Sequence, residues 1–177
     1  MEPLRRDDAP GAGPLQAGRP QVTVGAAPHP GPRTTCLDPG VAGAMSALSA
    51  AAKRGLGDPV LAELVMVRAS QINACAFCLD MHVDLALERG ETPKRIALLD
   101  AWAEAGDLFT ERERAALALT EAVTVLTADA VPDATYARAA EHFGDAGLAH
   151  LIALITVING WNRLMVSRRI APGGPAW

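Results

Sequence analysis

The chain has 177 residues, half of them hydrophobic, with a formal net charge of −4 and a pI near 5.5. This length and apolar fraction support one sizeable hydrophobic core, so a single domain is expected. The acidic balance gives no electrostatic reason to expect nucleic acid or an anionic membrane as a partner.

Aromatic residues make up only 4% of the chain, so the core must consist mainly of Ala, Leu, Val and Ile, and this composition favours helix. Arg5 and Arg6 are followed by acidic residues and prolines, not by the apolar run of a secretory signal. The longest apolar stretch, 148–158, is about half the ~18 residues that a membrane span needs. We therefore expect a cytoplasmic protein with no membrane partner.

The two ends of the chain differ in composition from its middle. Residues 1–40 hold eight of the thirteen prolines and show no helical periodicity, which predicts a disordered N-terminal tail. Cys36 lies in this tail and is interpreted as an incidental free thiol. Residues 41–169 are expected to form the helical domain, and 170–177, with its Pro-Gly-Gly-Pro run, a flexible C-terminal tail.

Helix signals then follow one another along the domain. An alanine-rich helix is expected over 42–54, and Asp58 followed by Pro59 predicts the start of the next one. Glu63 lies on that second helix between apolar neighbours. Asn73 is a good cap for a third helix that begins near Ala74 and ends at a glycine, Gly90.

The second half of the domain shows the same kind of signals. Thr92-Pro93 starts a helix over 94–104, and Thr110 with Glu113 forms a capping box before another. A further helix starts at Pro132, with Tyr136 and Phe143 directed inward, and stops at Gly144. The last helix, 147–169, is the most apolar. Six or seven helices without alternating strand patterns predict an all-α fold, and its apolar helices predict a homo-oligomer.

Three residues of the third helix can carry chemistry. Cys75, Cys78 and His82 share one face, because residues three, four and seven apart overlap on a 3.6-residue repeat. A thiolate is the reactive form of cysteine, and a helix N-terminus with a nearby imidazole lowers a thiol pKa. In a reducing cytosol such a Cys-x-x-Cys pair is more often catalytic or metal-binding than structural.

This pattern resembles the AhpD-like alkylhydroperoxidases of the carboxymuconolactone decarboxylase superfamily. The resemblance covers roughly residues 41–169 and rests on Glu63, on the segment RASQINACAFCLDMH, and on Asn159-Gly160-Trp161-Asn162-Arg163-Leu164. Glu63 stands twelve residues before Cys75, and His82 four residues after Cys78, a combination far more specific than a bare Cys-x-x-Cys.

The resemblance implies roles for four residues. Cys78 would be the peroxidatic thiol that attacks a hydroperoxide, and Cys75 the resolving thiol that forms a disulfide with it. Glu63 and His82 would form the proton relay. It further implies a dithiol reductant such as dihydrolipoamide or a thioredoxin-like protein, a dimer, trimer or hexamer of the same helical unit, and no flavin, haem or metal.

The chain departs from the family pattern at one position, and three alternative functions remain open. Some members carry a histidine directly before the second cysteine, where this chain has Phe77, so peroxidase turnover is expected to be weaker. A redox sensor or partner-binding oligomer with little turnover would use the same disulfide. A zinc site could use Cys75, Cys78 and His82, but a fourth ligand at a recognised spacing is missing. Lactone decarboxylation would leave the cysteines without a purpose.

Other polar residues of the last helix are interpreted as structural. Trp161 in an apolar helix is more often part of a core, and Asn162 more often a satisfied buried amide, so both stay outside the catalytic list. His142 and His150 have no evident chemical partner in the sequence.

Overall fold

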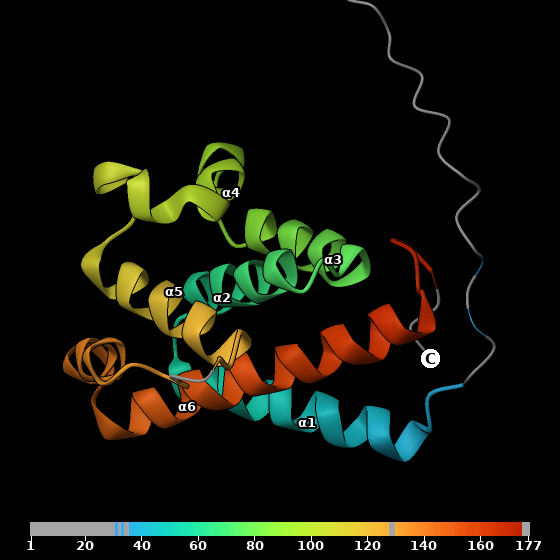
Figure 1. The fold of residues 1–177 in the computed structure, drawn as a ribbon. Helices are drawn as coiled ribbons and strands as arrows, with labels where there is room; N and C mark the ends of the chain where they lie inside the picture. Colours follow the sequence, from blue (N-terminus) through green and yellow to red (C-terminus); the bar gives the residue numbers. More distant parts are fainter. Residues whose placement is uncertain (1–30, 32, 34–35, 128–129, 175–177) are drawn as a thin grey trace, which may run out of the picture. The chain divides into compact units, whose positions relative to one another are not determined.

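The computed structural model describes residues 31, 33, 36–127 and 130–174. This part of the chain forms six α-helices and two short 3₁₀ helices, and it contains no strand, which confirms the all-α prediction (Figure 1). In chain order the elements are α1 Pro39–Leu56, α2 Pro59–Ile72, α3 Ala76–Glu88, α4 Pro93–Leu98, η1 Leu99–Glu104, η2 Gly106–Leu108, α5 Glu111–Thr124 and α6 Asp133–Arg168.

Two of the predicted helix starts are confirmed by their caps. The Asp58 side chain accepts a hydrogen bond from the backbone N–H of Leu61 at 3.0 Å, and Pro59 is the first residue of α2. Thr110 and Glu113 form the predicted capping box at the start of α5. Each cap satisfies backbone donors that the first helical turn leaves unpaired.

Helix α2 is the centre of the fold. It packs against α3, α5 and α6 and touches α1 (Figure 1). Its buried side chains divide between two clusters: Leu61 and Val65 belong to the main core with α1 and α6, whereas Leu64 and Val67 pack with Leu99, Phe109 and Leu117. A helix covered on nearly all sides has no solvated face, so every polar side chain on it needs an internal partner.

Helix α6 corresponds to two of the expected helices. Gly144 inside it has φ 61° and ψ 178°, so the helical backbone is broken where the sequence predicted a stop. By length and composition α6 could also cross a membrane, and it is longer than the apolar stretch 148–158 suggested. It packs on α1, α2 and α5, and 39% of its most apolar window is buried. Of the two side chains expected inward, Phe143 packs against the main core, whereas Tyr136 is 48% exposed.

The turn between α2 and α3 differs from the expected one. Asn73 ends α2 and does not cap α3, because its side-chain amide donates back to the carbonyl of Ala69 at 3.0 Å. Ala74 then takes a left-handed conformation with φ 50°, and Cys75 is the N-cap of α3. The helix therefore begins at Ala76, which puts Cys78 in its first turn.

The domain boundaries can be compared with the expected ones only in part. Helix α1 begins at Pro39, capped by Asp38, and Leu37 is buried in the main core, so the folded part starts earlier than residue 41. At the other end Ile170 packs against the same core. Residues 1–30 lie outside the described residues, and their disorder stays a prediction.

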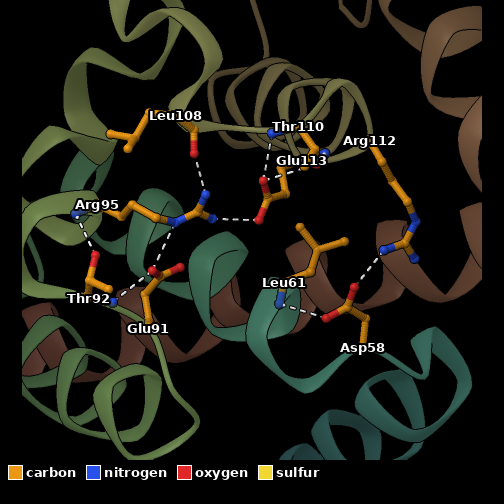
Figure 2. A network of polar contacts seen from close by, with 9 residues as sticks. All are labelled: Asp58, Leu61, Glu91, Thr92, Arg95, Leu108, Thr110, Arg112 and Glu113. Carbon is orange, nitrogen blue, oxygen red and sulfur yellow. Dashed lines mark hydrogen bonds and ion pairs between the residues drawn. The ribbon is translucent and has the colours of Figure 1, made fainter.

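A network of ion pairs ties the α4 region to α5 (Figure 2). Arg95 of α4 binds Glu91 at 2.8 Å and Glu113 of α5 at 2.5 Å, and it also donates to the carbonyl of Leu108. Arg112 of α5 reaches the α2 cap, Asp58, at 2.6 Å. The segment between α4 and α5 consists of short 3₁₀ turns, so these side-chain contacts fix its position in place of a continuous helix.

Replacing Ala74 by glycine is expected to stabilise the fold by about 1 kcal/mol, because a side chain in the left-handed region costs roughly that much and glycine avoids it. Urea unfolding of wild type and Ala74→Gly measures the difference. The matched control is Ala51→Gly, at an exposed position inside α1, which should destabilise by about 1 kcal/mol. A loss of stability in both variants would show that Ala74 is not strained.

Candidate active site

The four residues singled out in the sequence gather around the α2–α3 turn. Glu63 lies in α2, Cys75 caps α3, and Cys78 and His82 follow one turn apart on α3. All four are buried, with exposed fractions of 0% for Glu63, 1% for each cysteine and 4% for His82. The structure therefore brings together two pairs: Glu63 with His82, and Cys75 with Cys78.

The Glu63 carboxylate is held by three side chains. Its Oε2 atom lies 2.7 Å from Nδ1 of His82, and its Oε1 atom lies 2.6 Å from Nζ of Lys53. Arg89, at the C-terminal end of α3, forms an ion pair with the same Oε1 atom. A fully buried carboxylate without partners would cost several kcal/mol, so these contacts are what allows Glu63 to sit inside α2.

His82 is a neutral imidazole in this setting. Burial lowers its pKa to about 3, and the positive charge of Lys53 acts in the same direction. A neutral ring next to a carboxylate donates from the nitrogen that faces it, so Nδ1–H donates to Glu63. The other ring nitrogen, Nε2, is then left as a proton acceptor.

The two cysteines behave as one titrating unit. The thiol of Cys78 hydrogen-bonds the sulfur of Cys75, which lowers the pKa of Cys75 to about 7 and raises the pKa of Cys78. The side chain of Asn162 favours the thiolate of either residue. The resting pair therefore holds one negative charge near neutral pH, and that charge rests on Cys75.

A network of asparagines supports this pair, and it includes Asn162, which the sequence predicted as a satisfied buried amide. Asn162 is fully buried, accepts a hydrogen bond from Asn73 at 2.9 Å and donates to Ser70 at 3.0 Å. Asn73 also donates to Asn159, at 2.8 Å. The network joins α6 to the turn that carries Cys75. The signal that could have found Asn162 is an amide in the most apolar helix of the chain.

A cavity of about 300 Å³ opens beside the pair, and only one of the two cysteines lines it. Cys78 and His82 line it, together with Lys53, whereas Cys75 and Glu63 lie behind the wall. Phe77, in the place of a second histidine, also lines it, as does Trp161, whose Nε1–H donates to Ser49. A ligand in this cavity meets Cys78 first.

The remaining candidates lie elsewhere or have structural roles. Cys36 is exposed and does not line this cavity. His150 packs directly over Gly55, where α1 and α6 meet, and His142 is exposed. In the described part of the chain no three His, Cys, Asp or Glu side chains converge as metal ligands.

Comparison with known proteins agrees with this geometry. Residues 39–122 match the model of the carboxymuconolactone decarboxylase family. The chain is 43% identical over 105 residues to YdfG of Bacillus subtilis, covering 59% of this chain and 71% of that one, an uncharacterised protein. The chain belongs to the carboxymuconolactone decarboxylase family.

Two further relatives belong to the same comparison. YnjA of Escherichia coli, also uncharacterised, is 40% identical over 108 residues, which span 60% of this chain and 58% of YnjA, less than two thirds of its length. A crystal structure from Agrobacterium tumefaciens matches with a TM-score of 0.72 at 33% identity, over 76% of this chain and 92% of that one. That protein has unknown function and is proposed to be the antioxidant defence protein AhpD. The chain is thus AhpD-like in fold and sequence.

Removing the Asn162 amide is expected to raise the pKa of the cysteine pair. In a Cys36→Ser background the thiolate absorbance at 240 nm should rise with a midpoint near pH 7. Asn162→Ala should lower the thiolate signal at pH 6 by roughly tenfold or more, the effect of losing one hydrogen bond to a charged group. Asn159→Ala is the control, because Asn159 belongs to the same network without touching a cysteine. Equal midpoints in both variants would exclude a direct effect of Asn162.

The neutral state of His82 predicts acid sensitivity. Its pKa is about 3 in the folded protein and about 6.5 when unfolded, so between these values the unfolded chain binds the extra proton. Stability should be complete above pH 6.5 and fall as the pH approaches 3, by roughly 2–3 kcal/mol at pH 4.5. Urea unfolding at pH 7.5 and 4.5 measures this. His82→Gln should remove most of the pH difference, and His142→Gln, at an exposed position, should keep it.

Proposed function

We propose that this protein is a thiol-dependent peroxidase that reduces alkyl hydroperoxides through a Cys75/Cys78 dithiol–disulfide cycle. The observation that carries the proposal is that Cys78 and His82 line the same cavity, so that one ligand can contact both. Behind them lie the proton-relay partner Glu63 and the second thiol. The similar structure from Agrobacterium tumefaciens, proposed to be AhpD, supports the same function.

In the first step Cys78 attacks the terminal oxygen of the hydroperoxide. The S–O bond forms, the O–O bond breaks, and the products are Cys78 sulfenic acid and an alcohol. The proton of Cys78 passes to Nε2 of His82 and from there to the departing alkoxide, so the step consumes one thiol proton and needs no other acid. Because burial lowers the pKa of His82 to about 3, the imidazolium does not accumulate, and the proton moves from the thiol to the alkoxide in nearly one step.

In the second step Cys75 resolves the sulfenic acid. Its sulfur is in hydrogen-bonding contact with Cys78, and its pKa near 7 makes it a thiolate at neutral pH. Attack on the Cys78 sulfur forms the disulfide and releases hydroxide, which takes a proton from solvent to become water. Cys75 is thus assigned as the resolving thiol because it carries the charge, and Cys78 as the attacking thiol because it lines the cavity.

The cycle closes when an external dithiol reduces the disulfide by exchange. Dihydrolipoamide or a thioredoxin-like protein has the required chemistry, and a reducing compartment such as the cytoplasm would supply it. Exposed apolar side chains on α1, α3 and α6, such as Leu48, Leu87 and Val166, favour assembly into a homo-oligomer.

A redox sensor with little turnover is the second candidate. The observation that favours it is the burial of Cys75, which is 1% exposed and lies off the cavity wall, so a large reductant reaches the disulfide slowly. Oxidation would then persist long enough for a partner to respond to it. Steady-state consumption of hydroperoxide with dihydrolipoamide separates the two candidates, because a sensor reacts once for each chain.

The peroxidatic assignment is tested by stoichiometric cumene hydroperoxide on reduced protein in a Cys36→Ser background, followed by intact mass. The parent should lose two hydrogens. Cys75→Ser should give a sulfenic acid that dimedone traps, whereas Cys78→Ser should give none. Glu63→Gln should slow the reaction by about 10²-fold or more if the carboxylate supports proton transfer.

Wild-type Cys36 provides an internal reference, because it is an exposed free thiol in the same chain. If neither Cys75 nor Cys78 reacts faster than Cys36, the peroxidase function is wrong. If Cys75→Ser and Cys78→Ser exchange their expected behaviour, the cycle stands and the order of the two thiols is reversed.

A further inference from the structure

The buried site carries more positive charge than its carboxylate neutralises. Lys53 and Arg89 both bind Oε1 of Glu63, and Oε2 is taken by neutral His82. Two cations therefore face one carboxylate, and the thiolate of the Cys75/Cys78 pair is the other negative charge nearby. The position of Lys53, and not a surplus charge, then decides what this site can bind.

The two cations are not equivalent. Arg89 holds Glu63 from the end of α3 and does not line the cavity, whereas Lys53 does. The Lys53 side chain is 25% exposed, and among the described residues its ammonium has one hydrogen-bond acceptor, Glu63. An ammonium group has three N–H donors, so Lys53 can bind a second anion without leaving Glu63.

The rest of the cavity wall is mainly apolar. Its apolar lining consists of Met66, Phe77, Met81, Leu85, Trp161 and Met165. Lys53 is the one cationic side chain in the described lining, because His82 is neutral. At about 300 Å³ the cavity is at the small end of the range for small-molecule sites. A ligand that fits this cavity is therefore a compact apolar molecule with a single negatively charged group.

We propose that Lys53 is a carboxylate-binding residue, so that the cavity selects apolar organic acids and presents their hydroperoxide group to Cys78. The hydroperoxide part of this substrate class rests on the proposed function, whereas the carboxylate part rests on Lys53 and the apolar wall alone. A charge-assisted hydrogen bond inside the cavity would orient such a ligand as well as hold it.

The test uses unreactive ligands, so it does not depend on turnover. Binding of 4-isopropylbenzoate and of its neutral isostere 4-isopropylbenzamide is measured by calorimetry on the reduced full-length protein at pH 7. Wild type should prefer the carboxylate by at least tenfold. Lys53→Met should lose most of this preference and change the affinity for the amide by less than threefold. Lys94→Met, at an exposed position on α4, is the matched control and should keep the preference.

Two further measurements keep the proposal falsifiable if Lys53→Met folds poorly. Lys53→Arg keeps the charge and should keep the preference. In wild type the preference should fall between pH 7 and 9, because burial and Arg89 lower the pKa of Lys53 to about 8, and in Lys53→Arg it should not. The other groups facing Lys53 are Glu63 of α2, and His82, Arg89 and the cavity-lining Cys78 of α3. Equal wild-type binding of both ligands, or an unchanged preference without Lys53, would overturn the proposal.

The peroxidase function is tested separately with the matching hydroperoxides, 4-(2-hydroperoxypropan-2-yl)benzoate and its amide. A tenfold higher kcat/KM for the carboxylate in wild type, lost in Lys53→Met, supports both proposals. If the benzoate binds selectively but neither hydroperoxide is consumed, the carboxylate site stands and the peroxidase function falls.

Discussion

The buried carboxylate of Glu63 is the constraint on which the rest of the site depends. Helix α2 is covered on nearly all sides, so a charge in its middle must be met by other elements. Lys53 comes from α1, and His82 and Arg89 from α3, so the carboxylate ties three helices together. The same contacts fix the tautomer of His82 and leave its second nitrogen for chemistry. Stability and the proposed reactivity thus depend on the same ionic cluster, and a substitution at Glu63 should disturb both.

In the turn that carries Cys75, the backbone conformation determines where the thiols lie and therefore how they ionise. Ala74 adopts a left-handed conformation directly before the cysteine, held by the amide network from Asn73 to α6. This places Cys75 at the helix N-cap and Cys78 in the first turn, where the partial positive charge of a helix N-terminus favours a thiolate. One proton is shared between two sulfurs, and Asn162 stabilises the charged form of either. The strain at Ala74 is a local cost of bringing the two thiols into contact.

Much of the fold could be predicted from the sequence because helix boundaries depend on local chemistry. Asp58-Pro59, the Thr110 capping box and the break at Gly144 each follow from one or two residues. Asn73 was assigned to the wrong helix end because an asparagine can cap either end, and only the tertiary partners on α6 decide. The contacts of Lys53 and Arg89 with Glu63 could not be predicted from the sequence. A lysine ten residues before Glu63, for example, has no periodic relation to it. Contacts between helices set these partners, and no local pattern encodes them.

The position of the cavity also constrains how the proposed cycle can close. Cys75 lies behind the wall and Cys78 lines it, so an incoming thiolate meets the Cys78 sulfur and Cys75 becomes the leaving group. A leaving thiol with a pKa near 7 departs readily, which favours exchange in this direction. The route runs through about 300 Å³ of mostly apolar space. In the proposed cycle a reductant must therefore bring a thiolate into this space to reach Cys78, whether it is a small dithiol or a folded protein that extends a single cysteine.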